Sequence, residues 1–148
     1  MMDLSPRDPN WKDRVRTSFD AQAFMTHLGA RMTHVSPGAV DLELAMKPDL
    51  TQQHGFFHAG ATSSIADSAA GYAALSLFAP GFGVLTSEYK INLLNPARQP
   101  VLLARGRVVK PGRTLTIAKA DVYGLDDGDQ IHVATGLFTL MSVSGVTD

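Results

Sequence analysis

The stretch Ala61–Phe78, ATSSIADSAAGYAALSLF, is the longest helical candidate in the chain, and Pro80-Gly81 closes it. Most of its side chains are small or apolar, so the predicted helix is apolar nearly all round. A helix of that kind is buried, and its small side chains let it lie close against another backbone. We therefore expect this helix at the centre of the fold.

Strands are predicted on both sides of this helix. Four segments rich in Val, Leu, Ile and Thr follow it, separated by turn residues: Val84–Leu94, Val101–Val109, Arg113–Tyr123 and Gln130–Val143. Two more precede it, Arg31–Val35 and the alternating segment Val40–Met46. Short connections make neighbouring strands antiparallel. The pattern predicts an α+β fold in which an antiparallel sheet wraps around one buried helix.

A loose tail and two short helices are predicted before the first strand. The first helix runs from Asn10, its N-cap, to Arg16, and the second runs from Ser18 to Gly29. The buried side of the second helix is expected to hold Phe24, Met25 and Leu28. We accordingly divide the chain into an N-terminal segment, residues 1–29, and one domain, residues 30–148.

Composition restricts the class of protein. With 148 residues, 45% hydrophobic and 18% charged, the chain suits a single globular domain. It has no cysteine, which excludes disulfides, thiol nucleophiles and cysteine metal sites. The net charge of −1 argues against a nucleic-acid partner. Neither a secretory signal nor a membrane-spanning stretch is found, so we expect a cytoplasmic protein with no membrane partner.

Asp67 is the most informative single residue, because it lies about two turns into the apolar helix. A carboxylate is seldom buried without a partner or a task, which favours a catalytic role. The alternative is a structural aspartate that interacts with the helix dipole or faces solvent. Both interpretations remain open at this point.

The residues before the helix suggest a second element of a site. Ala59 and Gly60 immediately precede the predicted helix, so their N–H groups are expected to be free donors at its positive end. Such donors can stabilise a developing oxyanion. Asp67 cannot easily reach the N-terminus of its own helix. We therefore expect it to serve the helix of a neighbouring subunit.

A basic window supplies a third element. No acidic residue occurs between Glu88 and Asp121, whereas seven of the thirteen Lys and Arg residues do. A face of one sign suits a phosphate-bearing ligand, although an ordinary solvated sheet face has the same pattern. The turn Lys110-Pro-Gly-Arg113 places two cations on either side of a tight bend, which makes both candidate phosphate ligands.

Other motifs are absent. There is no serine in a G-x-S-x-G context, and the segment Gly55–Thr62 lacks the lysine of a phosphate-binding loop. His54 and His58 are spaced as metal ligands on a helix would be, but they fall in a predicted loop without the accompanying glutamate. We predict no metal site there and expect these histidines to hydrogen-bond loop backbone.

The segment QQHGFFHAGATSSIAD, Gln52–Asp67, resembles the N-x-x-G-x-x-H-G-G…A-D signature of hotdog-fold acyl-CoA thioesterases of the phenylacetate-degradation (PaaI) type. The segments Thr86–Ala97 and Val108–Arg113 resemble the strand and turn that follow in that family. The resemblance covers roughly Arg31 to Met141. It implies a six-stranded sheet around a central helix, dimers with shared active sites, often tetramers, and thioester hydrolysis without a cofactor.

The resemblance also implies roles for individual residues. Asp67 matches the nucleophile or general base, and Ala59 and Gly60 match the glycine pair whose N–H groups polarise the thioester carbonyl. Gln52 stands where the family usually has an asparagine that places substrate or water. Two further matches are His58, the motif histidine, and Thr86, a polar residue expected to reach the site from the other subunit.

This sequence departs from the family pattern at two positions. Gln52 replaces the usual asparagine, and its role could pass to Gln53. Ala59 replaces a glycine and would be strained in a left-handed conformation.

The function predicted from the sequence is therefore hydrolysis of acyl-CoA by a homodimer or a dimer of dimers. Residues 30–148 are expected to form the hotdog domain that carries this activity. Part of the acyl pocket is expected to be lined by Phe56, Phe57 and Tyr72. One alternative is an enoyl-thioester hydratase, which usually needs a histidine close to the aspartate, whereas none follows Asp67 until His132. Another is a non-catalytic acyl-CoA binding module, which would gain nothing from the carboxylate of Asp67.

Overall fold

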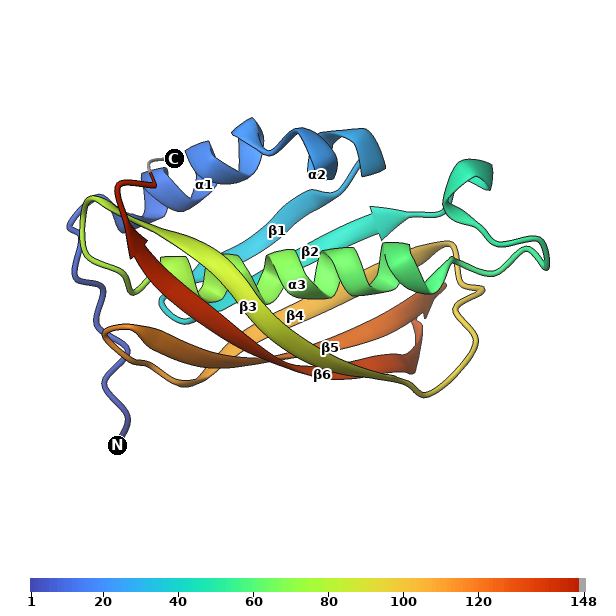
Figure 1. The fold of residues 1–148 in the computed structure, drawn as a ribbon. Coiled ribbons are helices and arrows are strands. Elements are labelled where there is room, and N and C mark those ends of the chain that lie inside the picture. Colours follow the sequence, from blue (N-terminus) through green and yellow to red (C-terminus); the bar gives the residue numbers. More distant parts are fainter. Residues whose placement is uncertain (147–148) are drawn as a thin grey trace.

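A strongly curved sheet surrounds one long helix, α3 (Ala59–Leu75), in the computed structural model, which describes residues 1–146 (Figure 1). All six strands are antiparallel to their neighbours, in the order β1-β2-β4-β5-β6-β3. Their bounds are β1 Arg31–Ser36, β2 Ala39–Ala45, β3 Phe82–Leu93, β4 Val101–Lys110, β5 Leu115–Asp126 and β6 Asp129–Ser144. This confirms the predicted hotdog architecture. Residues 147 and 148 of the predicted domain lie outside the described residues.

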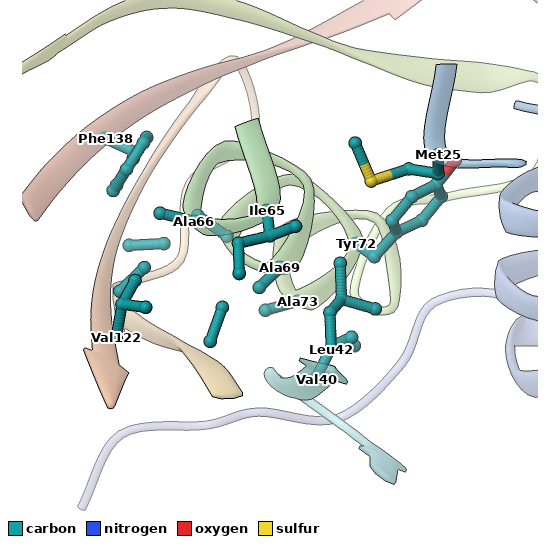
Figure 2. Packing of buried hydrophobic residues seen from close by; sticks show 14 of the residues in the cluster. Met25, Val40, Leu42, Ile65, Ala66, Ala69, Tyr72, Ala73, Val122 and Phe138 are labelled. Atoms are coloured by element: carbon teal, nitrogen blue, oxygen red, sulfur yellow. The ribbon is translucent and has the colours of Figure 1, made fainter. Parts of the chain in front are cut away.

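The helix lies close against the sheet because both surfaces carry small residues. Ala66, Ala69 and Ala73 are fully buried, and Figure 2 shows them beside Ile65, between the sheet residues Val122 and Val40. A Cβ added at Gly106 of β4 would lie 2.2 Å from the carbonyl oxygen of Ala69. Only glycine therefore permits this contact, and the small residues of the predicted helix serve close packing as expected.

The helix boundaries differ from those expected. Helix α3 begins two residues before Ala61, because the His58 side chain caps it by accepting a hydrogen bond from Gly60 N–H. It ends at Leu75, and the following residues form tighter turns in which Leu77 N–H and Phe78 N–H donate to carbonyls three residues earlier.

The N-terminal segment packs against the domain. It forms α1 (Trp11–Ala21) and α2 (Ala23–Leu28), so the first helix is longer than expected and the second begins later than Ser18. Met25 and Leu28 are buried as predicted, but Phe24 is 53% exposed, which corrects that expectation. The ring of Phe19 lies edge-on against Tyr72 of α3, with ring centroids 5.7 Å apart. Helices α1 and α2 thereby cover part of α3 that the sheet leaves open.

Candidate active site

A tightly held loop leads into α3. After the short helix η1 (Pro48–Leu50), Phe57 N–H donates to Ala97 O at 2.8 Å and His58 N–H donates to Leu50 O at 2.9 Å. Gly55 turns the loop with a φ of 82°, in the left-handed region that favours glycine. These contacts fix the point at which the backbone enters the helix.

The two predicted N–H donors have different environments. Gly60 N–H donates to His58 Nδ1 at 2.8 Å, so it is not the free donor that we expected. Within residues 1–146, no protein group accepts a hydrogen bond from Ala59 N–H, which begins the helix and is exposed. Ala59 is also unstrained, because Asp127 is the one described non-glycine residue with a positive φ. Ala59 N–H is therefore the donor that is available to a ligand.

Asp67 and Thr86 form a hydrogen-bonded pair. Thr86 Oγ1, on the edge strand β3, donates to Asp67 Oδ1 at 2.7 Å. Burial raises the pKa of the Asp67 carboxyl, and the hydrogen bond from Thr86 partly offsets that rise. Thr86 thus reaches Asp67 within one chain, which corrects the expectation that it comes from another subunit.

The loop and the carboxylate lie apart within one chain. Asp67 follows Ala59 by eight residues, so the two are separated by about 12 Å along the helix axis. They also line different cavities. A single thioester carbonyl cannot contact both groups of one chain.

The larger of these cavities, about 480 Å³, lies beside the loop. It is lined by the predicted residues Gln52, Phe56, Phe57, His58 and Ala59, and by residues 93–97. Phe57 is almost fully buried, whereas Phe56 is half-buried. The Gln52 side chain also supports the loop itself, because Gln52 Oε1 accepts a hydrogen bond from His54 N–H.

The smaller cavity, about 150 Å³, lies beside Asp67 and Thr86. Tyr72 lines this recess and not the cavity of Phe56 and Phe57, so one chain does not bring the three predicted aromatic residues together. The recess is completed by Ser18, Gln22, Ser68, Gly71 and Val84. Ser18 and Gln22 were not predicted as site residues, because no motif links the N-terminal helices to Asp67.

The predicted phosphate ligands lie at the other end of the sheet. Strand β4 begins near the loop, follows α3 for about 30 Å and ends at Lys110. The turn to Arg113 is therefore close to the C-terminal end of α3 in the same chain (Figure 1). A different arginine lies at the loop: the Arg98 guanidinium is 4.9 Å from the centre of the Phe56 ring.

Two cations of the basic window have acidic partners in the sheet. Arg107 pairs with Asp41 of β2 at 2.5 Å, and Lys119 pairs with Asp121 at 2.9 Å. These acidic partners lie outside the window in sequence but beside it in the sheet. These two ion pairs reduce the positive charge of part of the window.

Among residues 1–146, no group of three or more His, Asp or Glu side chains is placed to hold a metal ion. None of the described helices is both long enough and apolar enough to cross a bilayer.

Comparisons with known proteins place this geometry in context. Residues 54–131, just over half of the chain, match the sequence profile of the thioesterase superfamily. A thioesterase family protein from Silicibacter pomeroyi is 48% identical to this chain. Its structure aligns with 91% of this chain and 99% of that protein, with a TM-score of 0.89. A candidate esterase of Saccharolobus solfataricus is 30% identical over 112 residues, 76% of this chain and 72% of that protein.

A more distant structure shares the fold. The structure of the Escherichia coli PaaI protein, from the phenylacetic acid degradation operon, aligns with 93% of this chain and 96% of that protein, with a TM-score of 0.82. Its sequence identity is 20%, so this likeness concerns the fold alone.

Proposed function

Because the chain belongs to the thioesterase superfamily and is a thioester hydrolase, we propose that it hydrolyses acyl-CoA thioesters at sites shared between two copies of the chain. The observation that supports this most directly is Asp67, a carboxylate with a raised pKa that Thr86 orients on an otherwise uncharged helix. A perturbed carboxylate beside a cavity is typical of a catalytic group.

In the proposed reaction, the Asp67 carboxylate takes a proton from water and the resulting hydroxide attacks the thioester carbonyl carbon. The carbonyl oxygen becomes an oxyanion, which Ala59 N–H stabilises at the positive end of α3. The C–S bond then breaks, and the departing thiolate of coenzyme A receives the proton that Asp67 took from water, which returns the carboxylate to its ionised form. Direct attack by Asp67 to form an anhydride is the second route compatible with this geometry.

These roles require two subunits. The N–H donor and the carboxylate are about 12 Å apart along one helix, but an antiparallel α3 from a second copy would place its N-terminus beside Asp67. Strand β3 supports such pairing, because it is a long edge strand with exposed Leu85, Tyr89 and Leu93. In the resulting site, Asp67 and Thr86 come from one chain and the loop of Gln52 and Ala59 comes from the other.

An enoyl-thioester hydratase would need a histidine close to Asp67, and this arrangement does not supply one from His132. His132 lies on the sheet against Asp121, with 3.0 Å between His132 Nε2 and Asp121 Oδ1. It is therefore not a partner of Asp67 within the chain.

The test of the proposed function is release of free coenzyme A from a panel of acyl-CoA thioesters, followed with a thiol reagent. We expect turnover by the purified protein and a dimeric or tetrameric mass by light scattering. Absence of turnover across the panel would contradict the proposed activity. A fully active monomer would contradict the shared site while leaving the activity in place.

A further inference from the structure

The N-terminal helices form one wall of the recess beside Asp67. On the α3 side, Asp67, Ser68, Gly71 and Tyr72 line the recess, a spacing that places them on one face of the helix. On the opposite side the lining comes from α1 and from the residue that joins it to α2. The segment before the first strand is therefore part of the surroundings of the carboxylate.

Gln22 is the joining residue, and its side chain has a defined orientation. Its backbone N–H donates to Phe19 O at 3.1 Å, and Gln22 Oε1 accepts a hydrogen bond from Ser68 Oγ at 3.1 Å. Phe19 and Met25 on either side are buried and anchor the junction. Because Oε1 accepts from Ser68 and Gln22 lines the recess, the Nε2 amide group is available to donate a hydrogen bond to a ligand there.

The size of the recess determines which part of a thioester it can hold. A cavity of about 150 Å³ accommodates a molecule of roughly the size of benzene. The pantetheine and nucleotide parts of coenzyme A are too large for it. A substrate whose carbonyl carbon lies at Asp67 would thus direct its acyl group into the recess.

The lining of the recess is unusually polar for an acyl pocket. Ser18, Gln22 and Tyr72 contribute hydroxyl and amide groups, with Ser18 Oγ 3.4 Å from the Tyr72 hydroxyl oxygen. Val84 contributes the main apolar side chain. An unsubstituted acyl chain would leave the Gln22 amide group without its hydration, whereas an oxygen substituent can replace the lost water.

We propose that Gln22 is a specificity-determining residue, which donates a hydrogen bond from Nε2 to an oxygen substituent of a short acyl group. The preferred substrates are then short acyl thioesters that carry a hydroxyl or oxo group, over unsubstituted ones of the same length. This inference rests on the proposed function, because it assumes that Asp67 acts on the thioester carbonyl.

The experiment compares 3-hydroxybutanoyl-CoA with butanoyl-CoA, a pair that differs in one hydroxyl. Wild type should have the higher kcat/KM for the hydroxylated substrate. Gln22→Met keeps the length of the side chain and removes the amide, so the ratio of the two kcat/KM values should fall by about tenfold. Gln22→Ala should lose the same preference and, by enlarging the recess, gain activity on longer unsubstituted chains.

The control is Gln130→Met, at an exposed position on β6, which should keep the wild-type ratio. The expected result is a loss of preference in both Gln22 variants while each retains turnover of butanoyl-CoA. Turnover of both substrates with an unchanged ratio in either folded variant would overturn the role of Gln22 and leave thioester hydrolysis intact. Absence of turnover by wild type on every acyl-CoA would instead remove the proposed function and this inference with it.

Discussion

Thr86 Oγ1 donates a hydrogen bond to Asp67 Oδ1 at 2.7 Å, which joins the edge strand of the sheet to the middle of the buried helix. Thr86 is itself exposed, because β3 has no neighbour on its outer side within the chain. The bond therefore holds the carboxylate at the place where a second copy is expected to pair.

Asp67→Asn should lower kcat by about 100-fold or more, because it keeps the shape of the side chain and removes the base. Thr86 can still donate to the amide oxygen, so the fold should be retained. Steady-state hydrolysis of the best acyl-CoA substrate measures the effect. A rate near that of wild type would show that Asp67 has a structural role.

The same variant should be more stable than wild type at neutral pH. Burial raises the pKa of Asp67 above its ordinary value of 3.8, so the folded state binds this proton more tightly than the unfolded state does. The free energy of unfolding then decreases as pH rises from the unfolded to the folded pKa, and it stays lowered above that window. Asparagine has no proton to lose in this range, so the variant avoids this decrease in the free energy of unfolding.

Thermal unfolding at several pH values tests the effect on stability. The Tm of Asp67→Asn should exceed that of wild type at neutral pH, and the difference should disappear once pH falls below 3.8. A lower Tm at neutral pH would mean that the ionised carboxylate stabilises the fold.

Thr86→Val should shift the pH dependence of kcat/KM. Activity requires ionised Asp67 in the proposed reaction, so kcat/KM should rise with pH through the pKa of this group. The threonine hydroxyl stabilises the carboxylate and lowers that pKa. Its removal should raise the pKa and move the acid limb to higher pH. Thr33→Val, on the far edge strand, should leave the profile unchanged.

Much of the fold could be predicted from local patterns. The small residues of α3, the alternation of Val40, Leu42 and Leu44, and the turn residues between strands all carry information over a few positions, and each matched the structure. Phe24 was predicted wrongly because α2 has only six residues, which is too short for its buried side to be identified reliably.

The candidate site was harder to predict, because its residues are brought together by contacts between positions far apart in the sequence. Asp67 could be found because a carboxylate on an apolar helix is unusual, but its contact with Thr86 joins residues 19 positions apart. Gln22 and Ser68 are separated by 46 positions and belong to no motif. His58 was expected to hydrogen-bond backbone, and it does, but Gly60 N–H was not identified as the donor that it engages.

Ala59→Pro tests the N–H donor and the shared site together. Ala59 is the first residue of α3, where proline is well tolerated, and His58 has the extended backbone that proline requires before it. The substitution removes the N–H and puts the ring Cδ in its place, while the course of the backbone is kept. It should lower kcat by about 100-fold to 1,000-fold, the usual effect of deleting one oxyanion donor.

Mixing this variant with Asp67→Asn gives the decisive measurement. In a mixed dimer, one shared site carries both substitutions and the other carries neither. Unfolding and refolding the two inactive variants together should thus restore about a quarter of wild-type activity. If each site lay within a single chain, every site would contain one substitution and no activity would return. Each variant refolded alone is the control.

Arg98→Ala should raise KM for acyl-CoA while changing kcat little, which is the pattern of lost uniform binding. Arg98 lies over Phe56, which lines the larger cavity together with Ala59, so we expect its guanidinium to bind the phosphates of coenzyme A as the thioester approaches the N–H donor. The effect should be smaller with a pantetheine thioester, which lacks the nucleotide, and smaller at high salt, which screens exposed charges.

Arg113→Ala is the matched comparison, because Arg113 lies at the opposite end of the sheet in the same chain and can approach this cavity only from a partner subunit. A raised KM in Arg113→Ala with an unchanged KM in Arg98→Ala would move the phosphates away from Phe56 and onto the partner's turn. Unchanged KM values in both variants at low salt would show that neither arginine binds the nucleotide.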